Sequence, residues 1–387
     1  MKKKVIIVTK KMVLGGVEKS LISLINSIDK ELYDITLLLV ESGGELYNSI
    51  PNNIKIKTIK DIKNSKSFKE RLVYDFRKKQ YLKIIKNLFF FIKQKYSRNK
   101  YNYYEFISKI LDRQKENYDI AISYHVPAQL SAYYTINNIK AKKKILWIHC
   151  DINQVSIESQ NLNKYYNKYH EINCVSKQCY EVFINKFNKL KDRTNICYNT
   201  LDVEGIRLKA IELNPYINRN ANEIIICTVA RLSYEKGIDI AIDVCNYLNS
   251  NNYKCKWYVC GDGLARRELE EKIKKLNLQS QFILLGNINN PYTYINYCDI
   301  YVQPSRNEGY CMSLAEARVL NKPIITTDFI GARDQIKNNK TGIITSVSIK
   351  NISDSIIELI KNEKKRKELS SELEIEANKD VIYKELV

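Results

Sequence analysis

The chain has 387 residues, a length that suits two or three domains and excludes a small disulfide-stapled protein. Its 63 Lys and Arg residues outnumber 43 Asp and Glu residues, giving a net charge of +20. The hydrophobic content of 44% is ordinary for a globular protein and excludes wholesale disorder. The ten cysteines include no Cys-x-x-Cys pair and several lie in apolar runs, so we expect reduced core residues and no zinc site.

The N-terminal half shows short apolar runs separated by helix-length segments, which predicts βα units around a parallel sheet. These runs cover 4–9, 35–40, 120–124 and 145–149. The first run is too short for a signal-peptide core and lysines close it, so we expect a cytoplasmic protein without a membrane-spanning segment. Gly15, Gly16 and Glu18 follow it, and glycines there suit either a close backbone approach to a phosphate or sugar or a simple tight turn.

Residues 60–100 carry much of the charge, with 14 Lys or Arg residues against three acidic ones. Apolar residues recur there at helical spacing, which predicts a basic amphipathic helix. They are Tyr81, Ile85, Leu88, Ile92 and Tyr96. Such a helix fits an anionic membrane surface or the protein's own core about equally well. Nucleic acid is not expected as a partner, because no helix-turn-helix, zinc or RNA-binding pattern accompanies the charge.

The same alternation repeats in the C-terminal half and predicts a second parallel sheet. Strands are expected at 224–230, 257–260, 282–285, 300–303 and 324–327, and helices at 238–249, 265–276, 313–320 and 352–361. The predicted fold class is therefore α/β, with two Rossmann-like doubly wound domains facing a cleft. We expect an N-terminal domain at 1–203, a polar linker at 204–221, a C-terminal domain at 222–375 and a tail at 376–387 that packs back on the N-terminal domain.

Charged residues cluster where strands of the second series end. Glu308 and Glu316 flank the start of a predicted helix, whose free amide groups suit an anionic ligand such as a diphosphate. A carboxylate beside that ligand accepts hydrogen bonds from sugar or ribose hydroxyls. Arg231 and Lys236 follow the strand at 224–230 and provide compensating positive charge. The sequence therefore predicts a site for a phosphorylated ligand at this sheet edge.

Five motifs together resemble glycosyltransferase family 4. They are G-G-x-E at 15–18, A-R-L-x-x-E-K-G at 230–237, V-x-G-D-G at 259–263, L-G-N-I at 285–288 and E-x7-E at 308–316. The resemblance extends to residue 342 and fades over 45–117. It implies a retaining, nucleotide-sugar-dependent enzyme of GT-B architecture, with the acceptor bound by the N-terminal domain.

The resemblance also implies roles for individual residues. Arg231 and Lys236 would clamp the donor diphosphate, Glu316 would hold the ribose hydroxyls and Glu308 would face the transferred sugar. Further donor contacts would come from the Gly16 backbone, from Ile288 at the nucleobase, and from the backbone amides of Tyr310, Cys311, Met312 and Ser313. His125, in a His-x-Pro element, would contact the sugar near the reacting carbon as a catalytic residue, and Gly15 and His149 are the remaining candidates for substrate contact.

No two aspartates are separated by one residue, so the Asp-x-Asp metal clamp is missing and we expect metal-independent transfer without a cofactor. The expected reaction moves a hexose or N-acetylhexosamine, from UDP in preference to GDP, to a lipid-linked or saccharide acceptor. Capsule, O-antigen or other surface polysaccharide assembly at the inner face of the membrane is the expected setting. The alternatives are a nucleotide-sugar epimerase or hydrolase on the same fold, and a non-catalytic basic membrane-surface protein.

Overall fold

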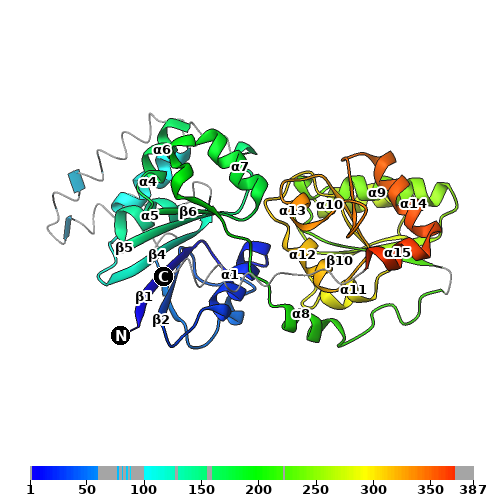
Figure 1. Cartoon of the computed structure of the whole chain (residues 1–387), viewed down its shortest axis with the longest axis horizontal. Helices are drawn as coiled ribbons and strands as arrows, with labels where there is room; N and C mark the ends of the chain where they lie inside the picture. The colour runs from blue at the N-terminus through cyan, green and yellow to red at the C-terminus, as the bar shows by residue number, and fades with distance from the viewer. Residues whose placement is uncertain are drawn as a thin grey trace. The chain divides into compact units, whose positions relative to one another are not determined.

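The computed structural model describes residues 2–59, 76–77, 81, 84–85, 88, 100–126, 130–154, 159–220 and 223–370 (Figure 1). Among these residues, 2–175 and 179–198 form one compact unit, and 176–178 and 199–370 form a second. The predicted tail at 376–387 lies outside the described residues. The few described positions between 76 and 88 are helical, and there Tyr81, Ile85 and Leu88 are exposed by 52%, 64% and 39%.

The first unit is built on a seven-stranded parallel sheet with the order β3-β2-β1-β4-β5-β6-β7. Its strands are β1 (Lys3–Thr9), β2 (Tyr33–Leu39), β3 (Lys55–Thr58), β4 (Asn117–Val126), β5 (Lys140–Ile148), β6 (Glu171–Cys174) and β7 (Thr194–Ile196). Its helices are α1 (Gly16–Ser27), α4 (Lys100–Ile110), α5 (Leu130–Asn138), α6 (Ser159–Tyr166) and α7 (Lys177–Lys186), with 3-10 turns η1 (Tyr47–Ser49), η2 (Ile152–Gln154) and η3 (Asn188–Arg193). β1 lies centrally, with Val5 paired to Ile35 and Ile120, so the strand order reverses there.

The second unit repeats this plan with a six-stranded parallel sheet, ordered β10-β9-β8-β11-β12-β13. Its strands are β8 (Ile224–Val229), β9 (Cys255–Cys260), β10 (Phe282–Gly286), β11 (Ile300–Gln303), β12 (Ile324–Thr327) and β13 (Ile343–Thr345). Its helices are α8 (Val203–Ala210), α9 (Ile238–Ser250), α10 (Arg266–Lys275), α11 (Tyr292–Tyr297), α12 (Met312–Val319), α13 (Ala332–Gln335), α14 (Ile349–Lys361) and α15 (Glu363–Leu369), with a 3-10 turn η4 (Tyr234–Lys236). The order reverses between β8 and β11, and ligands of such sheets bind at the carboxyl ends of the strands at this point.

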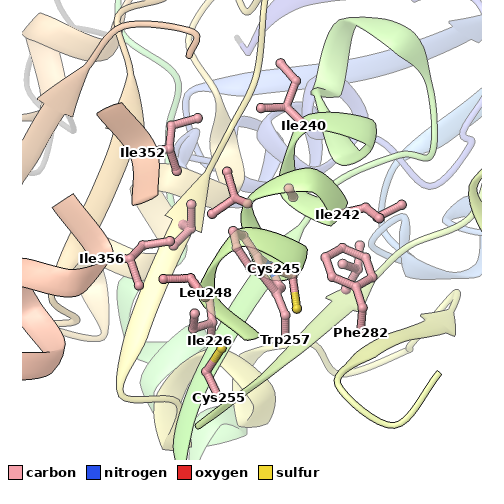
Figure 2. Packing of buried hydrophobic residues seen from close by; sticks show 14 of the residues in the cluster. Ile226, Ile240, Ile242, Cys245, Leu248, Cys255, Trp257, Phe282, Ile352 and Ile356 are labelled. Carbon is pink, nitrogen blue, oxygen red and sulfur yellow. The ribbon is translucent and has the colours of Figure 1, made fainter. Parts of the chain in front are cut away.

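Trp257 anchors the core on one side of the second sheet. Figure 2 shows it with Ile226 and with Cys245 and Leu248 of α9. Its indole N–H donates to the Thr228 hydroxyl over 3.0 Å, so the buried ring keeps a polar partner. α14 contributes a buried stripe at helical spacing, Ile352, Ile356 and Leu359. The cysteines predicted to be core residues are free thiols, and nine of the ten are buried.

The segment predicted as a linker is ordered and belongs to the second unit. It begins with α8, capped by Asp202, whose carboxylate accepts a hydrogen bond from the Gly205 amide over 3.0 Å. Ile206 and Ala210 are buried on one side of α8, and Tyr216 donates to the carbonyl of Tyr294 over 3.1 Å. Composition and a proline suggested a linker, but the segment packs only in part, since Ile206, Ala210 and Tyr216 are buried while Leu208 and Ile211 are exposed. The boundary between the units therefore lies at 198–199.

Candidate functional site

Two loops of the second unit meet at the reversal of its strand order. One follows β8 and contains η4, and the other follows β11 and leads into α12. The Glu235 carbonyl accepts hydrogen bonds from the amides of Arg306 and Asn307 over 2.8 and 3.2 Å. Gly237 has φ of 66°, and a Cβ there would lie 2.0 Å from the Pro304 carbonyl oxygen. Only glycine fits this approach, so the Lys-Gly sequence lets the two loops touch.

Lys236 and Glu308 form an ion pair where the loops meet. Their side-chain atoms Nζ and Oε1 are 2.7 Å apart, and the side chains are 13% and 11% exposed. Ser305 donates a further hydrogen bond to the same Glu308 oxygen over 3.1 Å. The structure therefore brings together two residues that the sequence analysis assigned to the diphosphate and to the sugar.

Arg306 fastens the two loops together and was not singled out from the sequence. Its guanidinium donates to both carboxylate oxygens of Asp239, over 2.7 and 2.6 Å, and lies 4.0 Å from the ring centroid of Tyr234. Burial alone would raise the pKa of the Asp239 carboxyl, but the hydrogen bonds and the charge of Arg306, with smaller contributions from a backbone hydrogen bond and Lys272, together lower that pKa. Neither residue belongs to a recognisable spacing pattern, so only the fold shows that they pair.

The N-terminus of α12 carries a strained residue. Cys311 precedes the helix with φ of 69° and makes no side-chain capping hydrogen bond. The other described non-glycine residues with positive φ are all asparagines, which adopt this conformation more readily. Strain of this kind concentrates at functional sites. Burial, followed by the charge of Glu308, raises the pKa of the Cys311 thiol, so the thiol stays neutral beside the carboxylate.

Glu316 lies one turn into α12 and is 2% exposed. The Tyr292 hydroxyl donates to its Oε1 over 3.4 Å. Ile288, assigned to the nucleobase, is half-buried and packs against a buried cluster that includes Cys260 and Phe329. Met312 and Ser313 form the first turn of α12, directly after Cys311 and the buried Tyr310. The predicted residues from Tyr310 to Glu316 therefore follow Glu308 directly along the chain, at the start of α12.

Arg231 differs from the other predicted donor residues because its side chain is 66% exposed. Its guanidinium lies 3.9 Å from Glu235, a separation that indicates a weak surface ion pair. The arginine is thus able to reorient toward a ligand at little cost.

The remaining candidates belong to the first unit. Gly15 precedes α1 and Gly16 is its first residue, and a Cβ on Gly15 would lie 2.5 Å from a carboxylate oxygen of the buried Glu18. His149 follows β5 with its ring 4.6 Å from that of Tyr124, whose hydroxyl lies 2.9 Å from that of Ser20. His125 is the penultimate residue of β4. His125 and His149 thus lie at the carboxyl ends of β4 and β5, as predicted, and the two glycines lie at the start of the helix that follows β1.

The described part of the chain contains neither a metal-binding cluster nor a membrane-spanning helix. No group of three or more His, Cys, Asp and Glu side chains there is arranged to hold a metal ion. Within the same portion of the chain, no helix combines the length and apolar character that crossing a bilayer requires.

Comparisons with known proteins find similarity to glycosyltransferases, mostly in the second unit. Residues 212–374 match the sequence model of the glycosyl transferases group 1 family. A 2-deoxystreptamine N-acetyl-D-glucosaminyltransferase from Niallia circulans is 29% identical over 38% of this chain and 40% of its own length. An N-acetylgalactosamine-N,N'-diacetylbacillosaminyl-diphospho-undecaprenol 4-alpha-N-acetylgalactosaminyltransferase from Campylobacter jejuni is 28% identical over 54% of this chain and 58% of its own. The chain thus spans about half the length of the curated relatives it matches.

The crystal structure of Anabaena HepE in complex with UDP-glucose is similar to the whole chain, with a TM-score of 0.72, 15% identity, and 99% of each chain covered. This similarity concerns the fold and confirms the predicted pair of Rossmann-like domains of the GT-B type. The segment that matches the family model, residues 212–374, contains the loops and the helix that carry Lys236, Glu308 and Glu316. Residues 212–374 of this chain therefore resemble the glycosyl transferases group 1 family in sequence.

Proposed function

We propose that this chain is a retaining glycosyltransferase that moves a hexose or N-acetylhexosamine from a UDP-sugar to a lipid-linked or saccharide acceptor in surface polysaccharide assembly. The observation that carries the proposal is the Lys236–Glu308 pair, 2.7 Å apart beside the N-terminus of α12 in the segment that matches the family. The Lys236 ammonium group and the free amides of the helix suit a diphosphate. The Glu308 carboxylate suits the hydroxyls of a sugar.

The donor assignment rests on the arrangement of the site and on the relatives. The ligand of the HepE structure is UDP-glucose, and the names of both relatives specify transfer of an N-acetylhexosamine. The name of the Campylobacter enzyme specifies an α linkage, which retention gives from an α-linked donor. Arg231, Lys236 and the α12 amides would stabilise charge on the departing diphosphate, the largest electrostatic demand of the step.

We propose that transfer needs no metal ion, because Lys236, Arg231 and the first turn of α12 supply the positive charge that a divalent ion would otherwise provide. Transfer should therefore continue unchanged in EDTA. Activity abolished by EDTA and restored by Mg²⁺ or Mn²⁺ would overturn this part of the proposal.

We also propose that the protein binds peripherally to the cytoplasmic face of the membrane, and the basic segment 60–100 supports this proposal. Tyr81, Ile85 and Leu88 are exposed, lie at helical spacing and stand among 14 basic residues, a combination that suits anionic lipid. Changing all three to serine should release the protein from vesicles containing phosphatidylglycerol. Three exposed aliphatic residues elsewhere, Leu208, Ile211 and Leu213, supply a matched serine control that should still bind. Equal binding by both triple variants would contradict the membrane proposal.

Product analysis separates transfer from its alternatives. The protein is incubated with UDP-GlcNAc, UDP-GalNAc, UDP-glucose or UDP-galactose, with and without undecaprenyl-diphosphate-linked monosaccharides. A transferase releases UDP in step with sugar added to the acceptor, and nuclear magnetic resonance of the product shows an α linkage. Free sugar released at the same rate without acceptor would indicate a hydrolase, and an altered donor epimer would indicate an epimerase.

A further inference from the structure

A buried amide lies beneath the Lys236–Glu308 pair. Gln303 is the last residue of β11 and its side chain is inaccessible to solvent. Its Oε1 accepts hydrogen bonds from the hydroxyls of Tyr301 and Ser313 over 2.7 and 3.2 Å. Its Nε2 donates to the Ser305 hydroxyl over 2.9 Å. Ser305 then donates to Glu308, so a chain of hydrogen bonds runs from the strand end to the carboxylate.

The chemistry of Glu308 fixes the direction of this chain. A carboxylate beside an ammonium group is an acceptor only, so Ser305 commits its single proton to Glu308. Ser305 must then accept from Gln303, which places the amide nitrogen on the serine side and the amide oxygen on the side of Tyr301 and Ser313. The reversed amide would leave the Ser305 oxygen without a proton for Glu308. The direction of each hydrogen bond between Gln303, Ser305 and Glu308 is therefore determined.

The backbone around this chain is fixed independently. Thr327 of β12 donates its hydroxyl to the carbonyl of Ser305 and to that of Gln303, the latter over 3.3 Å. Ser305 is itself fully buried, so its hydroxyl has few alternative partners. Lys236 and Ser305 both contact Oε1 of Glu308, so they position the carboxylate without occupying Oε2.

We propose that Gln303 is a positioning residue for the transfer reaction, acting through Ser305 to hold the Glu308 carboxylate oriented toward the sugar. The inference rests on the proposed function and adds a residue that lies outside the motifs found in the sequence. Ser313 ties the same chain to the first turn of α12, where the donor diphosphate is proposed to bind. Tyr301 keeps Gln303 oriented when the Ser313 hydroxyl turns toward a ligand.

The substitution Gln303→Glu tests this directly, because it keeps size and changes only the donor. An ionised carboxyl at this position accepts hydrogen bonds and donates none, so the Ser305 proton turns to it and Glu308 loses its partner. A protonated carboxyl donates to Ser305 as the amide does. Burial and the neighbouring Glu308 both favour the protonated form, so recovery is expected at accessible pH. The other titratable groups nearby are Tyr301, Cys311, Glu316 and Lys236.

The measurement is kcat and KM for the UDP-sugar between pH 5.5 and 8.5. For Gln303→Glu we expect kcat about 30 to 100 times below wild type at high pH, recovering to within about fivefold at low pH, with KM changed less than about threefold. Gln303→Met, similar in size but without a donor, should lose kcat without recovery at low pH. A role in packing alone would give the two variants the same pH profile.

Several outcomes would overturn the inference. Wild-type kcat in Gln303→Glu at high pH would do so, as would a loss with the same pH profile as that of Gln303→Met. If Gln303→Glu does not fold, Ser305→Ala provides the test instead. We expect its kcat to fall by a similar factor. An unchanged kcat would show that the hydrogen bonds from Gln303 through Ser305 to Glu308 do not matter for the reaction. A wild-type protein that transfers no sugar at all rejects the proposed function instead, so the two failures are distinguishable.

Discussion

The ammonium nitrogen of Lys236 lies 2.7 Å from a carboxylate oxygen of Glu308, and each side chain keeps little more than a tenth of its exposure. Removing two charges from water costs several kcal/mol each, so such a pair adds little net stability. In the proposed function, both charges bind the nucleotide sugar. Lys236 would pair with the diphosphate, and Glu308 would accept hydrogen bonds from the sugar hydroxyls. This is the role that the proposed function gives to the pair.

Lys236→Met should lower both activity and stability, because it leaves Glu308 buried without a counter-charge. We expect kcat/KM to fall about 100- to 1000-fold and the free energy of unfolding to fall by about 3 kcal/mol. Adding Glu308→Gln should restore most of the stability and none of the activity. Urea unfolding and sugar transfer measure both effects, and Lys274→Met, an exposed lysine of α10, serves as the control. Restored activity in the double variant would contradict the assigned roles.

Glu316→Gln should weaken UDP binding. The carboxylate is nearly inaccessible and is the residue assigned to the ribose hydroxyls, so its loss removes charge-assisted hydrogen bonds worth about 1.5–3 kcal/mol. Isothermal titration calorimetry should show UDP binding weakened about 10- to 100-fold. Glu268→Gln, on the exposed face of α10, should leave the affinity unchanged. Equal affinities for the two variants would exclude Glu316 from the nucleotide site.

Gly237→Ala should separate the two loops of the site. Its Cβ would lie 2.0 Å from a backbone oxygen and φ is 66°, so clash adds to backbone strain. We expect a loss of about 2–4 kcal/mol in the free energy of unfolding of the second unit, together with loss of UDP binding. Gly43→Ala is the matched control, because φ is 85° there but nothing lies within 4 Å of the added atom. It should cost only about 1 kcal/mol, and an equal cost at both positions would reject the steric argument.

Asp239→Asn should remove part of the stability present at neutral pH. The pKa of Asp239 is lowered in the folded protein, so its contribution is complete above the unfolded value of about 4 and disappears as pH falls through the folded value. The carboxylate is 36% exposed, so we expect only about 1 kcal/mol at pH 7 and progressively less as the pH falls below about 4. Urea midpoints against pH give the comparison. Asp354→Asn, on the exposed surface of α14, should show a smaller difference, and a pH-independent difference for Asp239→Asn would contradict the account.

The strongly apolar strands could be predicted from the sequence almost to the residue. The predicted strands at 300–303 and 324–327 coincide with β11 and β12, because parallel strands covered on both faces are continuous apolar runs. The short strands β3, β6, β7 and β13 were not predicted. Within β3, β6 and β7 no two apolar residues are adjacent, so they form no recognisable run, and the three residues of β13 include only Ile-Ile. These short strands form because they pair with neighbouring strands that are distant in the sequence, and no local sequence pattern indicates that pairing.

The candidate site likewise contains residues that a sequence motif indicates and residues that only the fold brings together. Glu308, Lys236 and Glu316 belong to motifs with fixed spacing, so the sequence could single them out as candidates. Gln303 and Asp239 contribute through partners supplied by the fold, and single buried amides or surface aspartates resemble many others in the chain. His125 stays a prediction, because the structure describes its place in β4 and nothing of its side chain.

The most direct test of the central claim is a melting experiment in EDTA with UDP, GDP and their sugars. A ligand at 100 times its dissociation constant stabilises the folded state by about 2.7 kcal/mol, which a thermal melt detects. The account predicts a higher melting temperature with UDP and at least one UDP-sugar, and no shift when Lys236→Met and Glu316→Gln are combined. No shift of the wild-type protein with any nucleotide, or an equal shift in the double variant, would contradict it.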